Sequence, residues 1–136
     1  EFVPQAGKAA DYLMWSPLML DPVNVPQHKE FAEAIKKRWN VVMNNDHASG
    51  YDGLNNILAS IERAGSLEPK KVVEALSKLD KKGILGRYVF EQSNHQIKNG
   101  EDFIPVPAAQ IVEGKSRIVW PAVLASGKFQ LPPWLK

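Results

Sequence analysis

The segment that decides the fold reads SGYDGLNNILASIERAGSLEPKKVVEAL, residues 49–76. Apolar residues recur at helical spacing along its first part, on one stripe of Tyr51, Leu54, Ile57, Leu58, Ile61 and Ala64. We expect Ser49 to cap this helix, Asp52 to lie near the positive end of its dipole, and Gly65 to end it in a left-handed conformation. The pattern predicts a helix from Ser49 or Gly50 to Ala64 that buries its apolar stripe.

Two more helices are predicted, one on each side of this segment. Downstream, Pro69 suits the first turn of a helix that closes at Lys81-Lys82-Gly83. Its expected buried side consists of Val72, Val73, Leu76 and Leu79. Upstream, Pro26 follows a cap at Asn24 or its neighbour, and a helix is expected to run to about Asn40, before a loop at residues 44–46. The apolar face of this helix consists of Phe31, Ala34, Ile35 and Trp39.

The rest of the chain has the pattern of short strands. The apolar run 12–15, which is followed by Pro17, predicts a buried strand. Arg87–Phe90 predicts another strand, and a polar loop follows it. Two β-rich runs, Ala109–Val112 and Arg117–Trp120, flank a glycine-containing turn and predict a hairpin. Strands and helices thus alternate before an antiparallel hairpin, which predicts an α/β fold with an antiparallel edge and an irregular tail.

Length and composition are those of one ordinary globular domain. Of 136 residues, 44% are hydrophobic and 24% charged, and 17 basic residues nearly balance 15 acidic ones. Basic runs such as Lys36-Lys37-Arg38 are scattered among acidic residues, which argues against a nucleic-acid surface. Because the chain has no cysteine, it has no disulfide, thiol nucleophile or thiolate zinc site. No apolar run approaches the ~20 residues that cross a bilayer.

One stretch, Asp46 to Asp52, gathers hydroxyl, imidazole and carboxylate groups. Hydrolases bring such partners together from separate elements, and this run lacks the Gly-x-Ser-x-Gly turn that presents a nucleophilic serine. His28, His47 and His95 are far apart and match no metal-ligand spacing. We therefore expect no catalytic residues, no metal site and no cofactor.

The order of the motifs is more informative than any one of them. Gly50-Tyr51-Asp52-Gly53 is followed by a helix stop at Ala64-Gly65-Ser66 and a helix start at Glu68-Pro69. Further on come Gly86-Arg87-x-x-Phe90 and Gln110-Ile111-Val112-x-Gly114-Lys115. Over nearly the whole chain this ordered set resembles the periplasmic solute-binding proteins of ABC importers that are related to the leucine/isoleucine/valine receptor. Glu68 in place of aspartate and Gly53 in place of alanine are mild departures from the family pattern.

The resemblance implies a longer, two-lobe α/β fold of type I, of which this chain is the C-terminal portion. The start at Glu1-Phe2-Val3-Pro4, without Met or leader, agrees with a fragment. By the family's layout, residues 1–45 belong to the C-terminal lobe and residues 46–85 form helices of the N-terminal lobe. Residues 86–136 would form the final crossover, the hairpin and the tail of the C-terminal lobe. We expect exposed apolar faces, and hence a fragment that self-associates or needs the missing N-terminal half.

The function implied by the resemblance is capture and delivery rather than catalysis. Such proteins hold a small molecule, here an amino acid or a related small acid or amide, in the cleft between the lobes. They deliver it to a membrane permease from the periplasm, or from the cell surface as a membrane-anchored lipoprotein. The alternative is a ligand-sensing regulatory or receptor domain of the same fold. We expect the carrier, because the chain ends at Lys136 without a following membrane segment.

The ligand contacts implied by the resemblance lie in the loop that enters the Tyr51 helix. They are His47, Ala48, Ser49 and Tyr51, with Phe2 next to a second cleft segment. Ala48 aligns where leucine-type receptors place an aromatic residue on the ligand, which implies a roomier pocket. His47, Ser49 and the N–H groups at the helix start are expected to attract a carboxylate. Core packing remains the alternative interpretation of Tyr51, and helix capping that of Ser49.

Overall fold

The computed structural model of the chain describes residues 2–18, 21–22 and 25–135, so the expected cap at Asn24 lies outside the described residues. The chain forms two compact units. The first combines Glu1–Leu18 with Val106–Lys136, and we call it the terminal unit. The second, Met19–Pro105, is the central unit. Each is described by itself.

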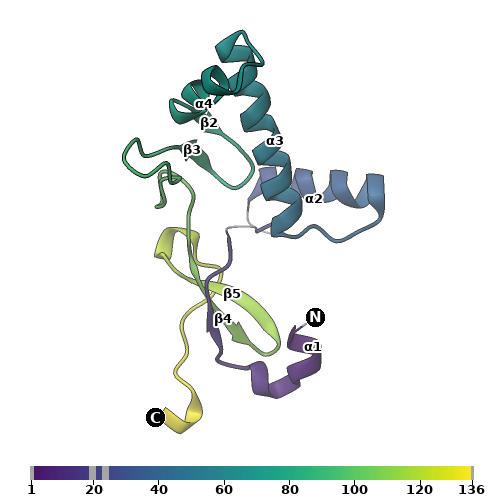
Figure 1. Cartoon of the computed structure of the whole chain (residues 1–136). Coiled ribbons are helices and arrows are strands. Elements are labelled where there is room, and N and C mark those ends of the chain that lie inside the picture. The colour runs from purple at the N-terminus through teal and green to yellow at the C-terminus, as the bar shows by residue number, and fades with distance from the viewer. Residues whose placement is uncertain (1, 19–20, 23–24, 136) are drawn as a thin grey trace. The chain divides into compact units, whose positions relative to one another are not determined.

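The terminal unit is built on a three-stranded antiparallel sheet in the order β1-β4-β5 (Figure 1). Its strands are β1 (Met14–Trp15), β4 (Ala108–Val112) and β5 (Lys115–Trp120). Two short helical segments precede β1, namely α1 (Phe2–Ala6) and the 3-10 turn η1 (Gly7–Ala10). Because β4 pairs on both sides, it is the central strand and its residues Ala109 to Val112 are buried.

The predicted hairpin is confirmed, and the predicted strand at 12–15 is confirmed in place but not in burial. Glu113 and Gly114 connect β4 to β5 with φ of 52° and 71°, the left-handed pair that a two-residue hairpin turn requires. Met14 and Trp15 are each 45% exposed. The expectation of a buried strand is wrong because β1 is an edge strand of two residues that pairs only with β4.

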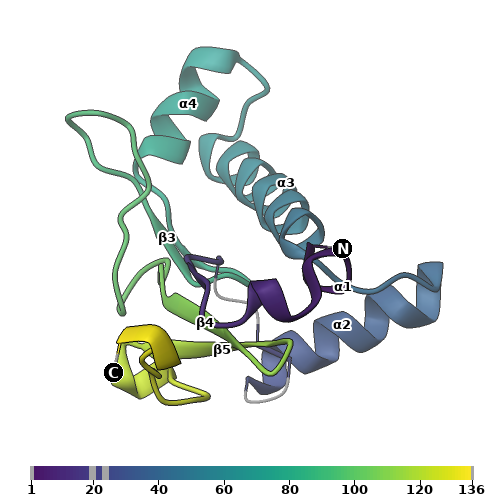
Figure 2. The same ribbon diagram turned by 90° about the horizontal axis from the view of Figure 1, so that it is seen from below.

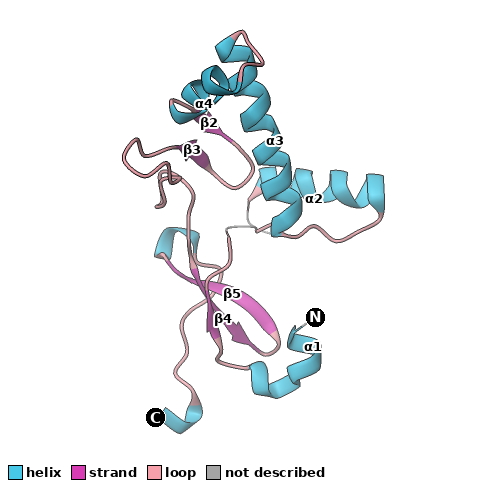
Figure 3. Cartoon of the chain, viewed as in Figure 1, coloured by secondary structure: helices cyan, strands magenta, loops and turns pink. Residues whose placement is uncertain are grey.

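The tail of the terminal unit is mostly loop, as predicted, with the 3-10 turns η2 (Ala122–Leu124) and η3 (Pro133–Leu135) (Figure 3). A buried glutamine holds it against the sheet. The side chain of Gln110, 1% exposed, donates to Gln130 O and accepts from Gln130 N, both at 2.9 Å. The side-chain amide of Gln110 thus satisfies both backbone groups of Gln130, as the backbone of a paired strand would.

Among its described residues, the central unit has three helices and a two-stranded antiparallel sheet (Figures 1 and 2). The helices are α2 (Pro26–Trp39), α3 (Asn45–Ala64) and α4 (Pro69–Ser77). The strands are β2 (Asp80–Lys82) and β3 (Arg87–Val89). Pro26 and Pro69 begin their helices as predicted, because a first-turn residue needs no N–H partner. Gly65 ends α3 at φ 58°, also as predicted.

Two predicted helix boundaries are wrong. Helix α3 begins at Asn45 rather than at Ser49, because Asn44 and His47 form a reciprocal cap one turn earlier. Ser49 is not a cap, since its hydroxyl donates to Asn45 O within the helix. Helix α4 ends at Ser77, and residues 81–83 do not close it. Lys81 and Lys82 instead belong to strand β2, which pairs with β3.

The buried face of α3 is the opposite of the predicted one. Its buried residues are Ala48, Asp52, Asn56 and Ser60, spaced four apart. The apolar stripe is largely exposed, with Tyr51 at 52% and Leu54 at 59%. Asp52 therefore lies two turns inside the helix, not at its positive end. The expectation failed because α2 packs on the stripe at Tyr51 and still leaves most of it exposed. Backbone amides of the β2–β3 turn bond instead to Asp52 on the other face.

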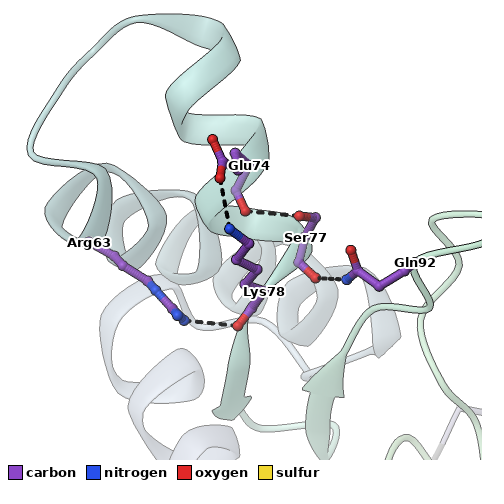
Figure 4. A network of polar contacts seen from close by, with 5 residues as sticks. All are labelled: Arg63, Glu74, Ser77, Lys78 and Gln92. Atoms are coloured by element: carbon purple, nitrogen blue, oxygen red, sulfur yellow. Dashed lines mark hydrogen bonds and ion pairs between the residues drawn. The ribbon is translucent and has the colours of Figure 1, made fainter.

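The end of α4 is tied to its neighbours by a polar network (Figure 4). Arg63 of α3 donates to Lys78 O at 2.8 Å, and the Lys78 ammonium pairs with Glu74 at 2.7 Å. Gln92, from the loop after β3, donates to Ser77 O. The Lys78 side chain lowers the pKa of Glu74, mainly through this hydrogen bond. The network attaches α4 to both α3 and the 91–100 loop.

Candidate functional site

In the central unit, an apolar groove of about 800 Å³ lies between α2 and the start of α3. The side chains that line it are Phe31, Ala34, Ile35, Arg38, Trp39, Val41, Asp46, His47, Gly50, Tyr51 and Leu54. Figures 1 and 2 show the first turns of α3 beside α2. The groove volume lies within the range of small-molecule sites, about 300–1,000 Å³.

His47 is one of the lining residues, and the helix cap determines its tautomer. Asn44 N donates to His47 Nδ1 at 3.2 Å, while His47 N donates to Asn44 Oδ1 at 3.1 Å. Because Nδ1 accepts, the ring proton is on Nε2. His47 therefore lines the groove as an oriented imidazole whose free N–H is a hydrogen-bond donor.

Aromatic and charged side chains form the walls. The ring of Tyr51 packs against Phe31 with centroids 5.1 Å apart and a tilt of 52°. The guanidinium of Arg38 lies 4.9 Å from the ring centroid of Trp39. Arg38 and Asp46 contribute one charge of each sign to an otherwise apolar lining. Such a surface suits a ligand with an apolar or aromatic body and a small polar end.

The structure brings together two of the five predicted ligand residues. His47 and Tyr51 both line the groove. Ala48 is fully buried, and Ser49 is exposed with its hydroxyl committed to Asn45 O, so neither is among the lining residues. Phe2 is 55% exposed and lies in α1 of the terminal unit.

Sequence reasoning missed a buried carboxylate, Asp52, which is 2% exposed. It accepts hydrogen bonds from Ile84 N at 2.8 Å, from Leu85 N at 2.9 Å and from the Tyr88 hydroxyl at 2.9 Å. Burial raises the pKa of Tyr88 above its ordinary value, and the hydrogen bond to Asp52 adds to the rise. No sequence signal indicated it, because the expected helix start at Ser49 placed Asp52 in the exposed first turn.

The structure also shows a small concavity of about 430 Å³ in the terminal unit, with Lys8, Asp11 and Glu113 among its lining residues. Asp11 accepts there from Gly114 N and closes the hairpin turn onto the chain. Among the described residues, no group of three metal-ligating side chains comes together. None of the described helices has the length and apolar character needed to cross a membrane.

A family model of the periplasmic binding proteins matches residues 2–112. The chain belongs to this family, as the ordered motifs predicted. Its members are binding proteins without catalytic activity, in agreement with the prediction that the protein is not an enzyme. No curated protein matches the chain in sequence.

Solved structures of transport proteins share the fold. A protein from Silicibacter pomeroyi described as a branched-chain amino acid ABC transporter matches with a TM-score of 0.76 and 19% identity, over 98% of this chain and 38% of that one. A leucine binding protein from Thermotoga maritima matches with a TM-score of 0.65 and 24% identity, over 85% and 32%. A solute binding protein from R. palustris, solved with benzoate, matches with a TM-score of 0.68 and 14% identity, over 93% and 34%.

These comparisons confirm the predicted fold class. The chain is a mixed α/β structure that corresponds to part of the type I periplasmic-binding-protein fold. It spans about a third of the length of the solved structures it matches, from 32% to 38% in the three described. At identities of 14–24%, the likeness concerns the fold and leaves the ligand open.

Proposed function

We propose that this chain is the C-terminal part of the substrate-binding component of an ABC importer, which captures a small acid or amino acid and delivers it to a membrane permease. The observation that carries the proposal is the family match over residues 2–112, together with the fold shared with transport proteins. The proposed location is the periplasm, or the cell surface for a lipoprotein.

The two compact units support a two-lobe organisation. Contacts within the chain divide it after Leu18 and after Pro105, whereas the layout expected from the resemblance divided it after residues 45 and 85. Helix α2 belongs with α3 here, because Phe31 packs on Tyr51 and both helices line one groove. We therefore propose 18/19 and 105/106 as the crossing points, with the terminal unit in one lobe and the central unit in the other.

Within the central unit, we propose that His47 and Tyr51 contribute to one edge of the ligand cleft. His47 offers its Nε2–H to a carboxylate, and the Tyr51 and Phe31 rings offer an apolar surface to the rest of the ligand. An aromatic acid such as benzoate, the ligand of the R. palustris relative, fits this chemistry. Ala48, Ser49 and Phe2 stay candidates for contacts made only by the complete protein.

The test is a thermal-shift and calorimetric screen of the complete protein that carries this chain, against branched-chain amino acids and aromatic acids. We expect one class to raise the melting temperature. His47→Leu, which removes the donor, should weaken binding at least about fivefold, the effect of a lost hydrogen bond to a charged group. The matched control, His95→Leu, changes an exposed histidine outside the groove and should leave affinity unchanged. A flat response to both classes would reject the importer proposal.

A further inference from the structure

The chain passes between the two compact units twice. Within each unit, hydrogen bonds link the residues next to one connection to those next to the other. In the terminal unit, the hydroxyl of Ser16, just before the first connection, donates to Pro107 O, just after the second, at 2.9 Å. In the central unit, both connections begin next to one turn, residues 83–87, which we call the anchor turn. The turn is closed by Gly83 N donating to Gly86 O at 2.7 Å.

The first connection is linked to the anchor turn by a buried histidine. Asp21 N donates to His28 Nδ1 at 3.0 Å, so the ring proton is on Nε2. That Nε2–H donates to Ile84 O at 2.8 Å. His28 is 5% exposed, and the neighbouring Gln27 side chain donates to Gly83 O at 3.2 Å. Asp21 thus reaches the anchor turn through the His28 imidazole.

The second connection is packed directly on the same turn. Arg87 N donates to Phe103 O at 2.9 Å, just before the unit ends at Pro105. Gly86 has φ 146°, and a Cβ there would lie 2.2 Å from Phe103 O, so only glycine allows this approach. The neighbouring Ile104 is buried.

We propose that the anchor turn is the base of the hinge between the two units, and that Asp52 and His28 are positioning residues that determine how freely the units move. The Asp52 carboxylate holds the turn by two backbone amides, Ile84 N and Leu85 N, from the buried face of α3. Loosening Asp52 frees the base of both connections, whereas loosening His28 frees the first alone. The inference rests on the proposed function, since a hinge serves a binder that closes on its ligand.

The first experiment is amide hydrogen exchange of the full chain with Asp52→Asn, which puts an NH₂ group opposite one of the two amides. We expect exchange at Ile84 and Leu85 to rise at least about fivefold, and exchange at Asp21 and Arg87 to rise with it. The control is Ser60→Ala, a buried residue on the same face whose hydroxyl bonds only to Asn56 O of its own helix. Faster exchange confined to Ile84 and Leu85 would overturn the proposal.

Two variants of His28 test the proposal even if Asp52→Asn unfolds the chain. His28→Leu should accelerate exchange at Asp21 and leave Arg87 protected, because Arg87 depends on Phe103 instead. His28→Gln retains an acceptor and a donor and should restore part of the protection at Asp21. Equal acceleration in the Leu and Gln variants, or no acceleration in either, would contradict a bridging role for His28.

The hinge itself is measured by the distance between two spin labels, because the chain has no cysteine that would compete for labelling. Lys70→Cys labels the central unit and Lys115→Cys the terminal unit, both at exposed positions. In labelled chains diluted with unlabelled protein and without ligand, Asp52→Asn should broaden the distance distribution and Ser60→Ala should not. An unchanged distribution would overturn the proposal. Because no ligand is added, this outcome is separate from a failed binding screen.

Discussion

At Gly83, the space that a side chain would occupy is filled by the carboxylate of Asp52. A Cβ built there would lie 2.6 Å from Asp52 Cγ and Oδ1, and that carboxylate is buried with three hydrogen-bond donors around it. It has no free direction in which to move. The absence of a side chain at residue 83 is therefore a packing requirement, imposed by a residue of another element.

We expect Gly83→Ala to lower the free energy of unfolding by about 1–3 kcal/mol, the usual cost of overpacking a buried site. Gly53→Ala is the matched control, because a Cβ at this mid-helix glycine meets nothing within 4 Å. That change should stabilise the chain by about 0.5–1 kcal/mol through helix propensity. Urea unfolding followed by circular dichroism measures both, and shifts of the same sign would contradict the argument.

The burial of Tyr88 makes the free energy of unfolding depend on pH, and it determines the sign of that dependence. The folded pKa is raised above the ordinary value of about 10, first by burial and then by the hydrogen bond to Asp52. A raised pKa means that Tyr88 contributes stability in full below pH ~10 and loses it as pH rises through the folded pKa. The difference in phenolate absorbance between the natural chain and Tyr88→Phe should therefore titrate above pH ~10. Titration at the ordinary value would show that the phenol is not buried.

Single residues were predictable where their role is local. Gly65 and Pro69 act through their own backbone geometry, which a sequence displays directly. Asp52 and His28 were not predictable, because their partners, Ile84 and Asp21, are set by the fold. Of the candidate site residues, His47 and Tyr51 line one groove, and their role in binding stays a prediction. The expected helix cap at Ser49 is wrong because Asn44 caps the helix earlier.

At the scale of elements, strand β4 shows how a tail can be held without strand pairing. The buried amide of Gln110 donates to and accepts from the backbone of Gln130. Near it, the rings of Tyr12 and Trp134 meet edge to face at 5.6 Å. The part of the tail around Gln130 is therefore held by one side chain that must be both donor and acceptor.

Gln110→Glu should release the tail, because a carboxylate cannot donate to Gln130 O and faces it with like charge. We expect a cost of about 1–3 kcal/mol, because the change removes the donor to this part-buried carbonyl and places a carboxylate at the buried position 110. Trypsin cleavage after the exposed Lys128 should then be faster. Gln130→Glu makes the same chemical change on an exposed side chain whose backbone alone is used, and should not alter the cleavage rate. Equal cleavage rates in the two variants would contradict the conclusion that the Gln110 side chain holds the tail.

Elements that depend on local chemistry were predictable from the sequence, whereas an element that depends on pairing with a partner was not. The hairpin and the starts of α2 and α4 depend on turn and proline chemistry within a few residues. The strand β2 was missed, since Asp80-Lys81-Lys82 has no apolar alternation. It forms because β3 pairs with it, helped by the Arg87 guanidinium at 2.6 Å from Asp80. That hydrogen bond lowers the pKa of Asp80.

For the molecule as a whole, the exposed apolar stripe of α3 predicts self-association. Leu54 and Leu58 are 59% and 48% exposed beside the α2–α3 groove. Exposed apolar surface of this kind drives association. We expect the isolated chain to form dimers or larger species at high concentration, as light scattering would detect.

The double change Leu54→Glu with Leu58→Glu should shift the chain toward monomer, because two charges disfavour burial of the stripe. Leu67→Glu is the control, since Leu67 is 80% exposed in the loop between α3 and α4, away from the groove. A compact monomer of the unchanged chain at high concentration would contradict the prediction, as would an equal effect of the control.

The sequence by itself determined the family, the helix starts at proline, the left-handed stop at Gly65 and the β4–β5 hairpin. These features follow from local backbone chemistry and from the order of motifs. Only the tertiary structure decided which face of α3 is buried and which residues hold the turn at 83–87. The spacing of an apolar stripe does not show which element, if any, packs against it. A buried carboxylate such as Asp52 is stabilised by donors 32 and 33 residues away, which only the fold brings close.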